Sequence, residues 1–187
     1  MQRLFTVTMI FFFLTAGVAR GEEVGGVHLP ETLSAGNTRL MLNGAGVRKK
    51  FFVKVYAAGL YLTQKSKDAA TVIETDAPMA MRMHFIYDGV TPKQLMETFN
   101  DGFTAATGGN TAPVQKKIDA FNAFFTKEAK KDDRYDFIYL TESGVTLFIN
   151  EARVGSIPGL DFKKLLFSVW LGEKPADDGL KKRLLAK

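Results

Sequence analysis

The first predicted elements are β-strands, because apolar and polar residues alternate along the segments concerned. The clearest alternation covers 49–62, where the odd positions of 51–57 are apolar and most even positions are polar. The Asn-Gly-Ala-Gly stretch at 43–46 is expected to end the strand before it. The predicted strands are a short edge strand with a turn within 24–39, then 40–42, 49–62, 80–87, 135–140, 145–150 and 152–157.

Helical spacing of apolar residues appears in two places, between the predicted strands and at the end of the chain. Thr91, Pro92 and Gln94 form the start signal of the first helix: a capping hydroxyl, a proline at the first helical position and a reciprocal side chain. The predicted helices cover 91–106, 111–129, 160–171 and 176–185.

The order of these elements indicates the fold class. Strands come first, two helices interrupt them, a hairpin follows and helices close the chain, so strands and helices do not alternate regularly. This order favours an α+β fold, in which helices cover one face of a large antiparallel sheet, over a parallel dinucleotide-binding sheet. A chain of 187 residues provides one domain with a substantial core.

Residues 1–21 have the pattern of a secretory signal peptide. A basic start is followed by an apolar run at 4–16, and Ala19 and Gly21 supply the small residues of a cleavage site. The run is shorter than the roughly 20 residues that cross a bilayer, so no stable transmembrane segment is expected after cleavage. The expected mature domain is 22–187, and the protein is expected to be secreted into the periplasm.

Composition excludes several kinds of chemistry. Without cysteine the chain has no disulfide, thiolate metal site or cysteine nucleophile. His28 and His84 are far apart in the sequence, so no histidine-based metal site is expected. No other cofactor is expected either. Loss of 1–21 lowers the count of basic residues from 25 to 23 against 20 acidic ones, a net charge of +3. This small excess gives no reason to expect a nucleic-acid partner.

Two glycine-containing stretches resemble catalytic or cofactor motifs only in part. In 44–49 the third glycine of a dinucleotide fingerprint is replaced by Lys49, and a strand follows instead of a helix. In 155–159 the serine stands one place too early for a nucleophile elbow. No catalytic residues are therefore assigned.

Arg48, Lys54 and Tyr56 are the candidate ligand-binding residues, because they place cations and a phenol on one side of a predicted strand. In a straight strand Arg48 and Tyr56 would be roughly 26 Å apart, too far to hold one small anion. Either the chain bends between Arg48 and Phe51, or this face is simply solvated. If it bends, a guanidinium and a hydroxyl can hold a carboxylate or phenolate beside apolar walls from 91–107.

Two stretches resemble the chalcone isomerase-like family. The first is LNGAGVR at 42–48 followed by FVKVYAAGLYL at 52–62, and the second is FKKLLFSVWLG at 162–172, followed by Pro175 and Leu180-Lys181. The resemblance implies an open-faced β-sandwich with a ligand cleft between sheet and helices. It also implies that the family's arginine, here Arg48, lies inside the cleft.

The family includes isomerases that close chalcones and non-catalytic proteins that bind fatty acids. The isomerases have a threonine where Tyr56 stands and a tyrosine in the helix region that here reads Gln-Leu-Met at 94–96. The resemblance therefore implies a non-catalytic binder of a fatty acid or similar amphipathic carboxylate. The alternatives are an isomerase of the intramolecular lyase type acting on an enone or phenolic substrate, and a partner protein in an envelope complex with a vestigial cleft.

Overall fold

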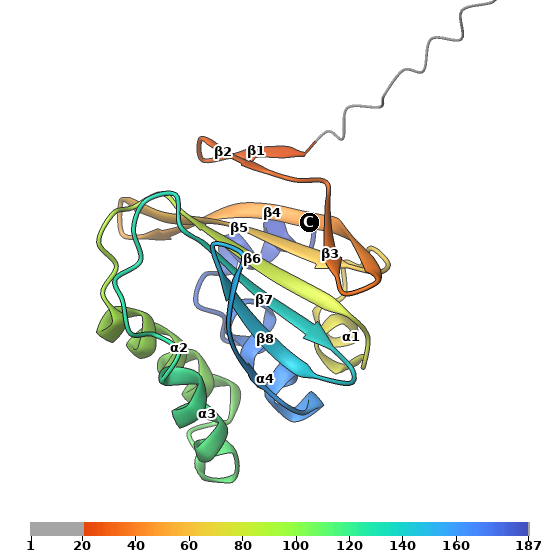
Figure 1. The fold of residues 1–187 in the computed structure, drawn as a ribbon, viewed down its shortest axis with the longest axis vertical. Helices are drawn as coiled ribbons and strands as arrows, with labels where there is room; N and C mark the ends of the chain where they lie inside the picture. Colours follow the sequence, from red (N-terminus) through yellow and green to blue (C-terminus); the bar gives the residue numbers. More distant parts are fainter. Residues whose placement is uncertain (1–20, 187) are drawn as a thin grey trace, which may run out of the picture.

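The computed structural model describes residues 21–186, so the predicted signal peptide, apart from Gly21, lies outside the described residues. The main sheet has seven strands, each antiparallel to its neighbour and arranged in chain order. Figure 1 shows this sheet crossing the molecule. Its strands are β3 (Thr32–Ala35), β4 (Thr38–Lys50), β5 (Val53–Leu62), β6 (Met79–Phe85), β7 (Arg134–Leu140), β8 (Gly144–Ile149) and β9 (Ala152–Ile157).

The helices pack on one face of this sheet. Buried residues of all five α-helices belong to one apolar core together with inward-facing strand residues. The described helices are α1 (Ala69–Glu74), α2 (Pro92–Ala106), the 3₁₀ turn η1 (Ala112–Val114), α3 (Gln115–Asn122), α4 (Leu160–Leu171) and α5 (Asp178–Leu184). The predicted α+β open-faced sandwich is confirmed, since aromatic rings from sheet and helices fill the layer between them.

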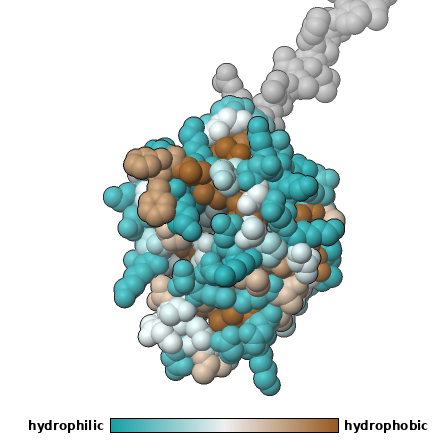
Figure 2. Space-filling model, turned by 90° about the vertical axis from the view of Figure 1, so that its left-hand side faces the viewer, coloured by the Kyte–Doolittle hydropathy of each residue, from teal (hydrophilic) through white to brown (hydrophobic). Residues whose placement is uncertain are grey.

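The opposite face of the sheet is partly covered by an N-terminal hairpin. Strands β1 (Glu22–Val24) and β2 (Val27–Leu29) form a separate two-stranded sheet. Their apolar side chains pack on Ala45 and Ala57 in a small second core. The outer surface is mainly hydrophilic on the side seen in Figure 2, with apolar groups projecting at its upper left.

Two expectations for the region around β4 are wrong. The stretch at 43–46 does not end a strand but lies inside β4, with a bulge between Leu42 and Gly44. The end of α5 packs against this stretch, and a Cβ on Gly44 would lie 2.2 Å from the carbonyl oxygen of Arg183. The glycine therefore serves close packing rather than a turn.

The expected single strand over 49–62 is also divided. The chain reverses at Phe51 and Phe52, and Lys50 pairs with Val53 to close a tight hairpin between β4 and β5. No glycine, proline or asparagine marks this turn, which is why the alternation appeared continuous.

The observed helices differ from the predicted ones mainly in length. The helix expected over 111–129 is reduced to η1 and α3, and Phe125 is buried from the irregular segment that follows. Helix α1, capped by Asp68, was not predicted. No helix within residues 21–186 is long and apolar enough to cross a membrane.

Candidate ligand cavity

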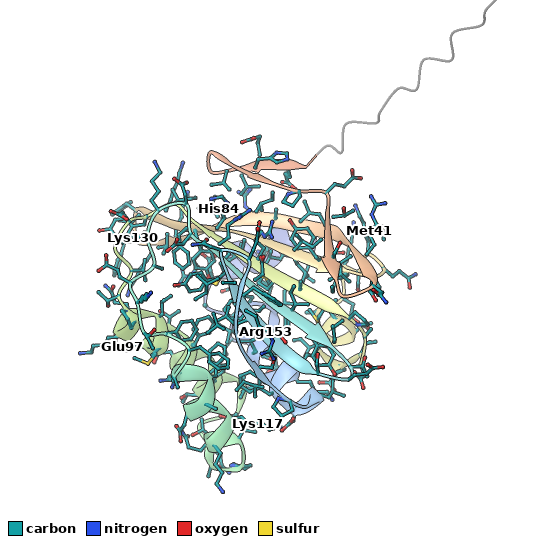
Figure 3. All side chains as sticks on the ribbon, in the orientation of Figure 1. Met41, His84, Glu97, Lys117, Lys130 and Arg153 are labelled. Carbon is teal, nitrogen blue, oxygen red and sulfur yellow. The ribbon has the colours of Figure 1, made fainter. Side chains whose placement is uncertain are left out.

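A cavity of about 230 Å³ lies between the β4–β5 end of the sheet and the helices α2 and α4. Its lining is predominantly apolar, and its polar groups come from the β4–β5 hairpin (Arg48, Lys50 and Tyr56) and from α2 (Gln94 and Thr98). Leu95 and Phe99 on α2 face it, whereas Glu97 lies on the outer side of that helix (Figure 3). The lining residues are Arg48, Lys50, Phe51, Val53, Val55, Tyr56, Met83, Phe85, Tyr87, Val90, Gln94, Leu95, Thr98, Phe99, Val169 and Trp170.

Arg48 and Tyr56 are brought together by the hairpin. They are directly opposite each other in the β4–β5 register, and both line the cavity. Opposite residues in an antiparallel pair have Cα atoms only about 4.5–5.5 Å apart, far less than the roughly 26 Å expected for a straight strand. Of the two alternatives left by the sequence, the bent chain is therefore the one found.

Tyr56 is a buried residue of the cavity lining. Its hydroxyl accepts a hydrogen bond from Nε1 of Trp170, at 3.1 Å. Burial raises the pKa of Tyr56, while Trp170 and the charge of Arg48 counteract part of this rise. The hydroxyl thus remains protonated at neutral pH, and its O–H is a donor for a group inside the cavity.

Arg48 lies at the rim with 19% of its side-chain area exposed. Its guanidinium donates to Oδ2 of Asp177 at 3.3 Å and also to the carbonyl oxygen of Lys49. Asp177 is the N-cap of α5, where its Oδ1 accepts from the Leu180 amide at 2.9 Å. Both contacts are made by one nitrogen of Arg48, Nη1, which leaves Nε and Nη2 as N–H donors for a ligand.

Lys54 is not brought into the cavity. Lys54 is exposed and pairs with Lys49, and its side chain is absent from the lining although Val53 and Val55 belong to it; Lys50 does reach the cavity. Sequence reasoning missed Trp170, which joins the helical layer to Tyr56. Its place in the apolar stripe of 160–171 predicted only core packing. The spacing of apolar residues carries no information about the hydrogen bond from the indole N–H to the strand.

The aromatic floor of the cavity is continuous with the main core. The ring centroids of Phe99 and Trp170 are 5.8 Å apart in an edge arrangement, and those of Phe99 and Phe121 are 5.0 Å apart. Such packed aromatic residues give a rigid apolar wall. The combination of a preformed apolar hollow and a few polar donors in its lining is typical of a small-molecule site.

The chain belongs to the chalcone isomerase-like family, whose family model matches residues 21–186. Among solved structures, a fatty-acid binding protein of Arabidopsis thaliana is similar in fold, with a TM-score of 0.66 and 17% sequence identity. The similarity covers 86% of this chain and 92% of the Arabidopsis chain. Comparison with curated proteins gave no match.

Proposed function

We propose that this protein is a non-catalytic binder of a fatty acid or a similar amphipathic carboxylate. The observation that carries the proposal is the placement of Arg48 opposite Tyr56 in the lining of a predominantly apolar cavity. A carboxylate beside this pair would accept charge-assisted hydrogen bonds from the guanidinium and a further one from the phenol. The hydrocarbon tail would then extend along Leu95 and Phe99.

The energetics favour a ligand with both a charged head and an apolar tail. Each methylene removed from water contributes about 0.8 kcal/mol, while a hydrogen bond to a charged group contributes about 1.5–3 kcal/mol. An anion without a tail would lose the contribution of the methylenes, which for a long tail exceeds that of the hydrogen bonds. The structural similarity to the Arabidopsis fatty-acid binding protein supports this choice of ligand class.

Binding is favoured over isomerisation by the side chains of the cavity. Among the described lining residues none is aspartate, glutamate or histidine, the groups that most often act as general base. Tyr56 stands where the isomerases have threonine, and the side-chain oxygen of Gln94 is engaged by the Thr91 amide at 2.9 Å in the capping box of α2. These groups can position an anion more readily than they can move its protons.

Export of the protein is part of the same proposal. The N-terminal pattern of residues 1–21 supports secretion, most simply into the periplasm of a bacterium. Such a binder would store or carry lipidic acids outside the cytoplasm. Recovery of the purified native protein from the periplasmic fraction, with a chain that starts near residue 22, tests this part.

The ligand class is tested by extraction and titration. Organic extracts of the purified protein are analysed by mass spectrometry, and the delipidated protein is titrated with fatty acids while the emission of its single tryptophan is followed. Because Trp170 lines the cavity, saturable changes with equimolar binding are expected. Absence of saturable binding for every fatty acid would contradict the proposal, and chalcone turnover that depends on Arg48 would replace it with an isomerase.

A further inference from the structure

The turn of the β4–β5 hairpin presents large apolar side chains to water. Phe51 is 88% exposed and Phe52 is 101% exposed, and Val53 beside them is 44% exposed. Phenylalanine usually contributes to stability by burial, so two adjacent exposed rings add nothing to the core. Figure 2 faces the side of the molecule on which this turn lies and shows apolar groups projecting from a hydrophilic surface.

Turn geometry does not explain these phenylalanines either. Phe51 has a φ of 55°, in the left-handed region, at the first of the two central positions of the turn. Two-residue hairpin turns with positive φ at this position favour glycine, and a bulky side chain there is strained. Residues other than Phe51 and Phe52 would therefore suit both the packing and the backbone conformation of this turn better.

Basic residues flank the two rings along the hairpin. Lys49 and Lys50 precede the turn and Lys54 follows it, and all three are exposed. No acidic residue occurs in the sequence between Glu31 and Asp68. Phe51, Phe52 and Val53 thus form an exposed apolar tip, and Lys49, Lys50 and Lys54 form a lysine collar beside it. This combination is complementary to a membrane surface, which offers hydrocarbon beneath negatively charged headgroups.

We propose that the β4–β5 hairpin docks the protein on an anionic lipid membrane. Phe51 and Phe52 enter the boundary between headgroups and acyl chains, and the lysine collar lies against the lipid phosphates. Contact with a second copy of the same hairpin is disfavoured, because a symmetric contact would bring the two collars of like charge together. The tip is too short to span the bilayer, so attachment is peripheral and reversible.

Docking would also place the cavity at the lipid surface. Phe51 and Val53 contribute to the cavity lining as well as to the exposed tip, and Lys50 lies at the same rim. A membrane-bound hairpin therefore turns the mouth of the cavity toward the acyl chains. This second step, direct uptake or delivery of an amphipathic carboxylate at the membrane, rests on the proposed function, whereas docking itself does not.

Docking is tested by co-sedimentation of the purified protein with two kinds of vesicle, one of phosphatidylcholine alone and one of equal parts phosphatidylcholine and phosphatidylglycerol. Binding to the mixed vesicles that weakens with added salt is expected. Phe52→Ser should reduce it about tenfold or more, because one ring is lost from the interface. Lys49→Gln with Lys54→Gln should reduce binding to the mixed vesicles and remove most of its salt dependence.

Matched controls separate the tip from general surface effects. Val154→Ser removes another exposed apolar side chain, and Lys116→Gln with Lys127→Gln removes two exposed lysines elsewhere, so both should bind vesicles like the parent protein. Phe51→Gly should raise the melting temperature by relieving the positive φ and yet weaken vesicle binding. Equal binding by the parent and Phe52→Ser, or a dimer in solution dispersed by that substitution, would overturn the proposal.

The outcome is independent of the ligand experiment. Phe52 does not line the cavity, so Phe52→Ser should still bind fatty acid in solution while losing the membrane. Vesicle binding without fatty-acid binding would contradict the proposed function alone. Fatty-acid binding without vesicle binding would contradict docking alone.

Discussion

The guanidinium of Arg48 lies 3.3 Å from Oδ2 of Asp177, so the cation at the mouth of the cavity is paired with the cap of the C-terminal helix. A ligand carboxylate would share the guanidinium with Asp177 or displace Asp177 from it. The pair thus lowers the affinity of the site for anions at the same time as it orients the guanidinium.

Asp177→Asn should therefore tighten the binding of fatty acids. Asparagine is as good an N-cap as aspartate, so α5 should remain stable, while the competing negative charge is removed. Because the pair is only partly buried, the gain should be modest, about fivefold in Kd. Asp178→Asn, an exposed neighbour in the first turn of α5, is the control. Unchanged or weaker binding by Asp177→Asn would show that the carboxylate does not compete.

Tyr56→Phe should cost both stability and affinity. The buried Nε1–H of Trp170 donates to the Tyr56 hydroxyl and would lose its acceptor, at a cost of about 1–3 kcal/mol in the free energy of unfolding. Denaturant titration measures this loss. Tyr87→Phe, at an exposed lining position, should leave stability nearly unchanged. Equal stability of Tyr56→Phe and the parent would mean that the hydrogen bond contributes nothing.

Affinity should rise with ligand length and then level off. At about 0.8 kcal/mol per methylene, each added carbon should tighten Kd about fourfold until the tail fills the cavity. Since 230 Å³ is below the roughly 300–1,000 Å³ of common ligand sites, the series from hexanoic to hexadecanoic acid should reach its plateau before the longest members.

Enlarging the cavity should move that plateau. Leu95→Ala removes a lining side chain of α2, at a cost of about 2–5 kcal/mol in stability, and longer acids should then gain affinity relative to shorter ones. Ile118→Ala, a core substitution away from the lining, should lower stability without moving the plateau. A plateau at the same length in Leu95→Ala would contradict the assignment of this cavity to the tail.

Alkaline pH should destabilise the fold through its buried tyrosines. Burial raises the pKa of Tyr135 and of Tyr139 to about 12, and it also raises the pKa of Tyr56 and Tyr61. Their ordinary pKa is near 10, so between pH 10 and 12 the unfolded chain releases protons that the folded chain retains. The stability contributed by these groups is complete below pH 10 and is lost as pH rises.

Denaturant titrations across this pH range measure the effect. Tyr135→Phe removes one such hydroxyl and should flatten the decline in the free energy of unfolding above pH 10. A decline of the same slope in Tyr135→Phe would assign the pH dependence to other groups.

Much of the sheet could be predicted because alternate residues of its strands face the main core, as Met81, Met83 and Phe85 of β6 and Tyr135 and Phe137 of β7 do. The β4–β5 hairpin could not, because Phe51 and Phe52 occupy a turn that usually calls for glycine or asparagine. The Asn-Gly-Ala-Gly stretch gave the opposite error, since its glycines serve contact with the distant end of α5. In both cases the structure depends on interactions that cannot be inferred from the local sequence.

The candidate site was predictable in its chemistry but not in its assembly. Arg48 and Tyr56 were chosen for their donors, yet their meeting depends on the unexpected turn. Trp170 and Asp177 contact them from segments more than a hundred residues away, a relationship that only the fold creates. Lys54, which the same chemical reasoning selected, lies outside the lining although Val53 and Val55 belong to it, because successive side chains of a strand point to opposite faces.

The most direct test of the account compares dodecanoic acid with dodecanol in titrations of the parent protein and Arg48→Gln. The two ligands share their tail, so their difference in Kd reports the carboxylate alone. We expect the parent to bind the acid at least about tenfold more tightly, and the two Kd values to converge in Arg48→Gln, because charge-assisted hydrogen bonds are lost. Equal affinities in the parent, or a preference for the acid that persists without Arg48, would contradict the claim that this arginine holds an anionic head group.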